Sequence, residues 1–262
     1  MSEVEWRKLR ADELRELARQ DGMVIVPIGA LEQHGPHLPV EVDATLGEQV
    51  ALRAARLIDA RGGRVAVLPM LWTGISEHHM SFGGTISLDL PTFAAVVEGI
   101  CRSLVRHGFK RIVLLNSHGG NDNALRTLTD ELTPKLGVPI VQTTYWEAAA
   151  EEIGAILETQ PNVQHACEAE TAMMLAVRPD LVAKDRIRLA KVNRTPDAEE
   201  IVGRGVYRWR TLAAMAASGV VGNPEAATAE KGERLLAAIA GALAAKLAHA
   251  ELWRMVWQAG AP

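Results

Sequence analysis

The chain has 262 residues, a formal net charge of −4, and hydrophobic and charged fractions of 48% and 23%. These values are typical of a globular protein, so they exclude wholesale disorder, and the slight acidity excludes a dedicated nucleic-acid binder. The charged N-terminus lacks a signal-peptide pattern, the longest apolar run (235–245) falls well short of the ~20 residues that span a bilayer, and two cysteines suit a reducing compartment. We therefore expect a cytoplasmic protein with no nucleic-acid or membrane partner.

Short apolar runs alternate with longer amphipathic stretches along the first half of the chain. The apolar runs predict strands over residues 23–28, 65–68, 111–115 and 138–142. The amphipathic stretches between them predict helices over residues 43–60, 91–107 and 121–135. Pro91 suits a first helical turn and Gly108 suits the position just after a helix end.

This order of elements predicts an α/β protein, a three-layer α/β/α sandwich with a mostly parallel central sheet. Such a sheet binds ligands beyond the carboxyl ends of its strands, so the residues after Ile28 and after Leu115 should share one edge. Farther along, residues 193–200 are polar and predict a surface excursion, and a last long helix is expected over 226–251. We expect residues 1–262 to form a single domain.

Glu32, His34 and Asp43 follow the first predicted strand, within and just after a loop rich in glycine and proline. Because Glu32 and His34 alternate, an extended backbone would place both side chains on one face. Imidazole and carboxylate ligands suit Zn²⁺, Mn²⁺ or Fe²⁺, and Asp43 could bridge two ions. The alternative is that these polar side chains make only local hydrogen bonds in a loop.

His118 follows the third predicted strand and is succeeded by Gly119 and Gly120, which permit a close approach of a ligand. The alternative is a glycine-rich turn in which Asn121 caps the next helix, although a cap and a metal ligand could share one turn. A phosphate-binding loop is disfavoured, because the chain has neither a P-loop nor a dinucleotide-binding glycine pattern.

His165 precedes a predicted helix that begins near residue 167 and carries Glu168 and Glu170 in its first turn. The helix dipole favours anions there, which alone could explain both carboxylates. His165 suits a general acid or base. We expect Cys167 to be a small packing residue rather than a nucleophile, since it has no clear base partner.

The segment 74–85 follows the second predicted strand and offers Ser76 as a candidate substrate contact. His78 and His79 are adjacent and point in different directions, so at most one is expected to enter a site. We expect His37 and His78 to contact the side chains that form the site, without binding a metal ion or the substrate themselves. The remaining histidines, expected to have no chemical role, are His79, His107 and His249.

Three of these motifs, 32–39 with Asp43, 116–121 and 165–171, resemble those of the creatininase (creatinine amidohydrolase) family. The resemblance implies an α/β fold, two divalent metal ions (Zn or Mn, with Fe also acceptable), and hydrolysis of C–N bonds in cyclic or linear amides. It also implies a homo-oligomer, commonly a hexamer.

Matching positions imply the roles of individual residues. Glu32 and His118 match the ligands of one ion, and His34 matches a ligand of the other. Asp43 matches the carboxylate that bridges them. His165 matches the position that contacts substrate and moves protons.

One departure from the family pattern concerns the second ion. Creatinine-hydrolysing members carry a Glu ligand two residues after the histidine of the second motif, where this chain has Gly120. We expect Glu170, ahead of Glu168, to complete that ion's ligand set. Ser76 matches a substrate-contacting serine, and Gly119 replaces an aromatic residue, which implies a reshaped substrate pocket.

The resulting hypothesis is a metal-dependent amidohydrolase acting on a small-molecule amide. A hydroxide bridging the two ions would attack the amide carbon, and His165 would protonate the leaving nitrogen, assisted by Glu168 or Glu170. A deformylase or peptide amidohydrolase of the same family is the alternative within this chemistry. A non-catalytic metal- or ligand-binding protein that retains the fold is the alternative of another class, and a nicotinamide-dependent oxidoreductase is disfavoured by the missing glycine pattern.

Overall fold

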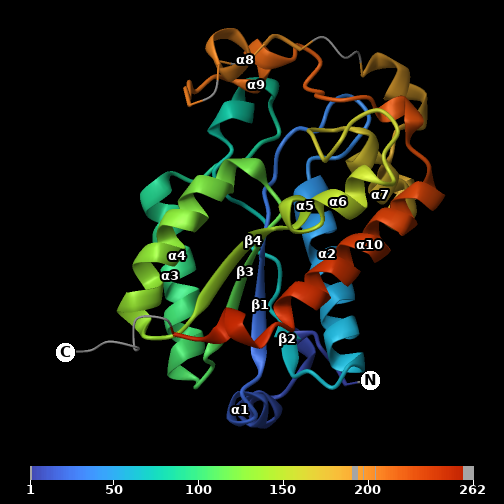
Figure 1. Ribbon diagram of the computed structural model, residues 1–262. Helices are drawn as coiled ribbons and strands as arrows, with labels where there is room; N and C mark the ends of the chain where they lie inside the picture. Colours follow the sequence, from blue (N-terminus) through green and yellow to red (C-terminus); the bar gives the residue numbers. More distant parts are fainter. Residues whose placement is uncertain (1, 191–193, 197, 204, 256–262) are drawn as a thin grey trace.

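The computed structural model describes residues 2–190, 194–196, 198–203 and 205–255 (Figure 1). Its central sheet runs in the order β2-β1-β3-β4, and each neighbouring pair is parallel. The strands are β1 (Met23–Ile28), β2 (Val65–Val67), β3 (Arg111–Asn116) and β4 (Ile140–Thr144). The predicted strands are thus confirmed within two residues at each end; β4 begins only after Pro139, which has no N–H to donate to the sheet.

Long helices flank this sheet, and shorter ones follow its carboxyl edge. The first four are α1 (Ala11–Arg19), α2 (Val42–Ala60), α3 (Leu90–Arg106) and α4 (Asp122–Leu136). The next three are α5 (Tyr145–Ala148), α6 (Ala150–Gly154) and α7 (Glu168–Val177). The last three are α8 (Ala198–Val202), α9 (Leu212–Met215) and α10 (Ala229–Leu247).

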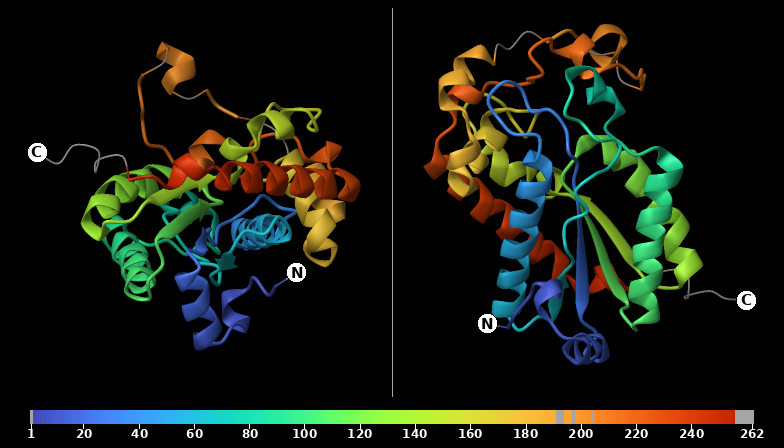
Figure 2. Two further views of the ribbon diagram at one scale, coloured as in Figure 1. Left: turned by 60° about the horizontal axis from the view of Figure 1, so that its bottom comes forward. Right: turned by 180° about the vertical axis from the view of Figure 1, so that it is seen from behind.

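The helices form two layers, one on each face of the sheet (Figures 1 and 2). Alternate residues of β1 point to opposite faces: Val24 and Val26 pack with α3 and α4, whereas Met23 and Ile25 pack with α2, α7 and α10. Both faces of β1 and β3 are therefore covered, which explains the apolar runs of these two central strands. The predicted three-layer α/β/α sandwich with a parallel sheet is confirmed.

Helix ends follow local capping chemistry. Asp89 accepts a hydrogen bond from the Thr92 amide at the start of α3, and Gly108, at φ 91°, follows its end. Helix α10 begins later than predicted because the Thr228 hydroxyl caps it, accepting from the Lys231 amide. It also ends earlier, at Leu247, ahead of a short 3₁₀ turn over 250–253.

The segment that carries α8 and α9 lies beyond the carboxyl edge of the sheet, at the top of Figure 1. Of the predicted surface excursion, residues 193 and 197 lie outside the described residues, and the others are exposed or half-buried. Among the described residues, no helix is both long and apolar enough to cross a membrane.

Candidate metal centre

Two loops and two helix starts bring carboxylates and imidazoles together at the carboxyl edge of the sheet. Glu32 and His34 follow β1, His118 follows β3, and Asp43 and Glu170 lie in the first turns of α2 and α7. Each of these five residues is at most 4% exposed. Because β1 and β3 are adjacent and parallel, their following loops meet, as the sequence predicted.

Asp43 lies at the centre of this cluster. Its Oδ1 is 3.3 Å from Nε2 of His34, and its Oδ2 is 3.1 Å from Nδ1 of His118. On the outer sides, Glu32 Oε1 is 3.3 Å from Nδ1 of His118, and Glu170 Oε1 is 3.8 Å from Nε2 of His34. The cluster therefore consists of two adjoining sets of donors that share the Asp43 carboxylate.

Hydrogen bonds fix the orientation of both imidazoles. Nδ1 of His34 lies 3.0 Å from the Glu32 carbonyl, and Nε2 of His118 lies 2.9 Å from the Ile75 carbonyl. A carbonyl only accepts, so these nitrogens carry the ring protons. The opposite nitrogens face the carboxylates and would offer their lone pairs to a bound cation, the arrangement that metal-binding histidines adopt.

Several atoms of the cluster lack hydrogen-bond partners among the described residues. They are Glu32 Oε2, His34 Nε2 and Asp43 Oδ2, all buried. A buried polar atom without a partner is costly, so such a group calls for a bound ion or other ligand. Oxygen and imidazole nitrogen donors suit Zn, Mn and Fe, and the residues present therefore fit divalent cations.

The buried carboxylates of the cluster also favour the binding of a cation. Burial raises the pKa of the Glu32 and Glu170 carboxyls. Burial opposes the charged form of Asp43 as well, but His34 and His118 outweigh it and lower the pKa of Asp43. For the two imidazoles, the carboxylates outweigh burial and raise their pKa well above the ordinary value. A cation would satisfy the same carboxylates without protonating the histidines.

His165 lies beside the cluster and is held by a backbone carbonyl. Its Nε2 is 2.8 Å from the Gln33 carbonyl, and its Nδ1 is 3.6 Å from Oε1 of Glu32. Burial, together with the nearby His34, lowers the pKa of His165 well below its ordinary value. The ring is therefore neutral, with its Nδ1 lone pair directed toward the cluster.

Glu168 does not reach the cluster, and its hydrogen bonds point to a structural position instead of the predicted catalytic one. Its oxygens accept hydrogen bonds from the Thr159 hydroxyl, at 2.6 Å, from the backbone amides of Glu158 and Thr159, and from the Lys231 ammonium. Both Glu168 and Lys231 are buried. Glu168 thus anchors the start of α7, while Glu170 on the same turn faces the ions' expected position.

Ser76 lies away from its predicted position as a substrate contact, and Gly120 lies in a tightly packed backbone. The Ser76 hydroxyl lies 3.2 Å from Nε2 of His118, on the side away from the carboxylates, so Ser76 supports His118 instead of lining the cavity. A Cβ on Gly120 would collide with the Ile75 carbonyl and with His118. The backbone therefore leaves no room for a Glu ligand at position 120, which is consistent with Glu170 in that role.

Asn121 ties the loops together and does not cap α4 with its side chain. Its Oδ1 accepts from the Ile75 amide at 2.9 Å, and its Nδ2 donates to the Gly29 carbonyl at 3.0 Å. The loops that follow β1, β2 and β3 are thereby held at one point, which fixes the geometry of the donors they carry.

The sequence missed His79, and it wrongly allowed only one of the adjacent histidines near the site. Residues 77–82 form a 3₁₀ helix, and both His78 and His79 line the cavity. Nε2 of His79 is 3.4 Å from Oε1 of Glu32, and its Nδ1 is 3.2 Å from the Gln33 side-chain nitrogen. The cluster thus has a further imidazole around Glu32.

The structure also shows the surroundings of the remaining histidines and of Cys167. His37 supports α7 through Nε2, which lies 2.8 Å from the Thr171 hydroxyl. His107 and His249 are exposed and are not among the residues that line the cavity. Cys167 is fully buried, and burial raises the pKa of its thiol to about 12, so it packs rather than reacts.

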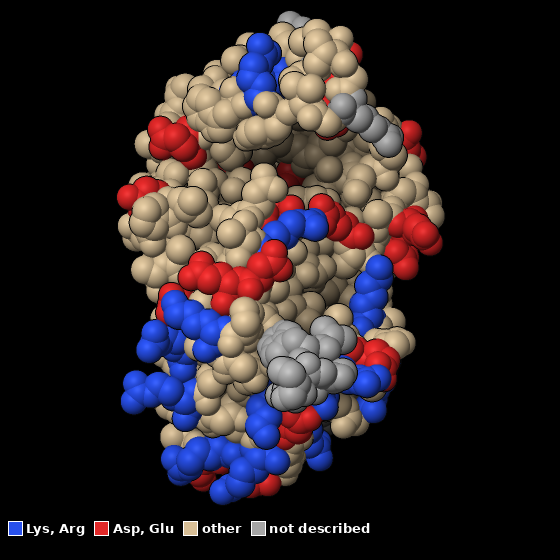
Figure 3. All heavy atoms as spheres, turned by 60° about the vertical axis from the view of Figure 1, so that its left-hand side comes forward, with Lys and Arg blue, Asp and Glu red and all other residues tan. Residues whose placement is uncertain are grey.

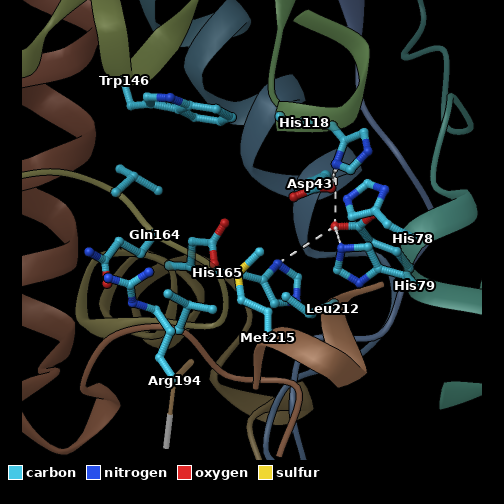
Figure 4. A pocket seen from close by; sticks show the side chains of 15 residues that line it. Asp43, His78, His79, His118, Trp146, Gln164, His165, Arg194, Leu212 and Met215 are labelled. Carbon is cyan, nitrogen blue, oxygen red and sulfur yellow. Dashed lines mark ion pairs between the residues drawn. The ribbon is translucent and has the colours of Figure 1, made fainter. Parts of the chain in front are cut away.

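A cavity of about 440 Å³ opens onto the cluster. The surface is hollowed below the uppermost segment, with an acidic side chain visible at depth (Figure 3). In Figure 4 the histidines and Asp43 occupy one side of this cavity, and Trp146, Gln164 and Arg194 occupy the other. Its volume is in the range of sites for small organic ligands.

Comparison with known proteins points to one family. The family model described as "Creatininase: Creatinine amidohydrolase" matches residues 7–247. The creatinine amidohydrolase of Pseudomonas putida is 34% identical over 71% of this chain and 75% of its own. The mycofactocin precursor peptide peptidase of Mycobacterium ulcerans is 32% identical over 82% of this chain and 80% of its own.

Solved structures agree. A creatinine amidohydrolase (creatininase) is 28% identical, with a TM-score of 0.77, over 94% of this chain and 97% of its own. A manganese creatininase and a zinc–zinc form of a creatininase mutant are each 29% identical, with a TM-score of 0.76, over 94% of this chain and 97% of their own.

Proposed function

This chain belongs to the creatininase family and is a hydrolase of carbon–nitrogen bonds, and from that premise we propose that it cleaves an amide at a centre of two divalent cations. The observation that carries the proposal is the position of Asp43, whose two oxygens lie 3.3 Å from Nε2 of His34 and 3.1 Å from Nδ1 of His118. A carboxylate between two imidazoles would suit a shared ligand of two cations, with one imidazole completing each set.

The cluster divides into two ligand sets. Glu32, His118 and Asp43 would hold one cation, since both carboxylates lie within 3.3 Å of Nδ1 of His118. Asp43, His34 and Glu170 would hold the other. Manganese and zinc–zinc forms of creatininase support Mn or Zn, and Fe suits the same donors. When bound, two such cations make water a better nucleophile at neutral pH and polarise a carbonyl oxygen.

His165 would act as the general base and then as the general acid. Its Nδ1 faces the cluster while the Gln33 carbonyl holds its Nε2, so Nδ1 can accept the proton that the attacking water loses. The same atom can then deliver that proton to the leaving nitrogen, which an amide needs because an unprotonated amine anion is a poor leaving group. A neutral imidazole at rest, as its lowered pKa gives, suits this order of events.

Hydrolysis of a peptide amide is the second candidate, and one observation favours it. The relative of Mycobacterium ulcerans that is named a peptide peptidase aligns over more of this chain than the creatinine amidohydrolase of Pseudomonas putida. The chemistry at the centre is the same for both candidates, and so is the use of His165.

A substrate screen with metal-loaded protein tests the proposal. Protein loaded with Mn²⁺ or Zn²⁺ is assayed with creatinine, formamides, lactams and short peptides, and metal content is measured by elemental analysis. We expect bound metal and turnover of at least one class, both lost in His34→Ala. Full metal content and turnover in His34→Ala would contradict the ligand assignment. Binding of these compounds without any hydrolysis would support the alternative of a non-catalytic protein.

Assembly and location follow from the family resemblance and remain part of the proposal. We propose a homo-oligomer, with a hexamer as the expected form, which light scattering of the purified protein tests. The two cysteines are free and buried, which suits a reducing compartment such as the cytoplasm.

A further inference from the structure

The side chain of Gln33 is buried and is bound to the backbone at both ends of its amide. Its Oε1 accepts a hydrogen bond from the Gly35 amide at 2.8 Å, and its Nε2 donates one to the Gly219 carbonyl at 3.3 Å. A backbone N–H only donates and a carbonyl only accepts, so these two contacts determine the orientation of the Gln33 amide. One hydrogen on Nε2 of Gln33 remains for a further acceptor.

The acceptor for this hydrogen is Nδ1 of His79, which lies 3.2 Å from Nε2 of Gln33. Nε2 of His165 is also near, at 3.1 Å, but it donates its own hydrogen to the Gln33 carbonyl at 2.8 Å and therefore cannot accept one. Since Nδ1 of His79 accepts, it carries a lone pair, and the proton of this ring is on Nε2.

The protonated Nε2 of His79 faces Glu32. It lies 3.4 Å from Oε1 of Glu32, and both side chains are at most 2% exposed (Figure 4). His165 approaches the same oxygen, with its Nδ1 at 3.6 Å. The two rings thus present different atoms to Glu32: His79 offers an N–H group, whereas His165 offers a lone pair.

We propose that His79 is a positioning residue of the candidate metal centre. Its Nε2–H group holds the Glu32 carboxylate in the orientation that binds a cation, and Gln33 fixes His79 in the tautomer that can do so. Hydrogen bonds of this kind to metal ligands raise metal affinity, because the ligands are oriented before the ion arrives. The inference rests on the proposed metal centre and adds two residues that bind neither the metal nor the substrate.

Zinc affinity of His79 variants tests the inference. The dissociation constants of Zn²⁺ are measured on the full chain by competition with a chelator. His79→Leu removes the N–H group, and we expect the affinity for one ion to fall about tenfold or more. His79→Gln returns an N–H group near the position of Nε2, and its affinity should stay within about threefold of wild type.

The matched control is His107→Leu, because His107 is exposed and lies just after the end of α3. This variant should bind Zn²⁺ like the wild type. Wild-type affinity in His79→Leu would overturn the inference. So would a His79→Gln protein as weak as His79→Leu, because an N–H group at this position would then have no effect.

A double variant tests whether Gln33 acts through His79. Gln33→Met removes the donor to Nδ1 of His79, and we expect its Zn²⁺ affinity to fall about tenfold. If the two residues act together, the losses of Gln33→Met and His79→Leu do not multiply in the double variant. Losses that multiply fully would contradict the role assigned to Gln33.

Nitrogen NMR reads the His79 ring directly. The Zn²⁺-loaded protein is labelled with ¹⁵N-histidine, and the signals of His79 are those that disappear in His79→Gln. We expect a neutral ring with its proton on Nε2. A ring protonated on Nδ1, or one whose Nε2 binds zinc, would overturn the inference in the wild-type protein, whatever the variants do.

None of these measurements requires turnover, so this inference and the proposed function fail in different ways. If the wild type binds no Zn²⁺, the proposed metal centre is wrong, and the inference is wrong with it. If the wild type binds Zn²⁺ but hydrolyses no amide, only the proposed hydrolysis fails. If it binds Zn²⁺ and hydrolyses an amide, and His79→Leu retains full affinity, only the role of His79 is wrong.

Discussion

The two walls of the cavity at the candidate metal centre differ in their burial and in the elements that form them. The inner wall carries the donor cluster on residues at most 4% exposed, attached to β1, β3, α2 and α7. The outer wall comes from the surface segment around α8 and α9, with Arg194, Leu212 and Met215 facing the cavity. Arg210 holds that segment through the carbonyls of Thr195 and Pro196, at 3.2 and 2.8 Å.

This difference suggests that the inner wall carries the residues for metal binding and catalysis, whereas the outer wall determines which substrate is accepted. Donors fixed by the sheet and by buried hydrogen bonds keep the positions that a metal centre requires. A wall made from a surface segment can change its side chains without disturbing the core, because few core contacts depend on it. We therefore expect changes in the inner wall to remove activity or stability and changes in the outer wall to alter substrate preference.

Asp43→Asn should have the largest effect, because it removes the charge that both imidazoles face. We expect loss of about one bound metal or more per chain and a fall in kcat of about 10³-fold. Elemental analysis and turnover of the best substrate from the screen measure the two effects. Asp59→Asn, at the far end of the same helix, is the control and should change neither. Activity retained in Asp43→Asn would contradict the bridging role.

Lys231→Met should have the next largest effect, because it leaves the Glu168 carboxylate buried without the Lys231 ammonium. Loss of one partner of a buried pair costs about 3 kcal/mol of the free energy of unfolding, measured by urea titration. Arg53→Met is the control, because the Arg53–Glu233 pair involves the same helix α10 but Glu233 is largely exposed. That surface pair should contribute about 0.5 kcal/mol.

The Lys231–Glu168 pair also predicts a pH dependence of stability. Burial raises the pKa of Glu168, but hydrogen bonds from Lys231 and Thr159 outweigh it, so the net pKa is below the ordinary 4.5. A lowered folded-state pKa gives stability that is present above 4.5 and lost as the pH falls through the folded value. The difference between wild type and Lys231→Met should therefore narrow below pH 4.5. A difference that stays constant down to the acid transition would be inconsistent with this pair.

Gly120→Ala should be destabilising and Gly119→Ala should not, although the two positions are adjacent. The added methyl at position 120 meets the Ile75 carbonyl and His118, so we expect a cost of about 2 kcal/mol and weaker metal retention. At position 119 the same methyl meets open space, and the change should stay within about 0.5 kcal/mol. Thermal unfolding of both variants, with and without added metal, makes the comparison. Equal effects would show that the backbone around His118 adapts.

Met215→Ala, on the outer wall, should have the smallest effect. Met215 lines the cavity and contributes no metal donor, so we expect KM to rise by less than about tenfold while kcat and metal content are kept. Steady-state kinetics and elemental analysis measure this. Loss of metal in Met215→Ala would remove the distinction between the two walls.

Local sequence patterns determined most of the fold and the identity of most donors. The apolar runs located all four described strands, and they are strongest in the central strands β1 and β3, which are covered on both faces. The parallel order then placed the residues after β1 and β3 at one edge, which joined Glu32 and His34 with His118. Asp43 was found from its place just after this loop.

Only the tertiary structure decided between neighbouring side chains. Glu168 and Glu170 share the first turn of α7, yet two residues of helix rotate by about 200°, so they face opposite ways. Lys231, which is distant in sequence, lies on α10 and pairs with Glu168. Glu170 faces the cluster instead, where it contacts His34. The entry of His79 depended likewise on a 3₁₀ turn. Sequence spacing determines which residues can share a site, but the packing of distant elements decides which of them do.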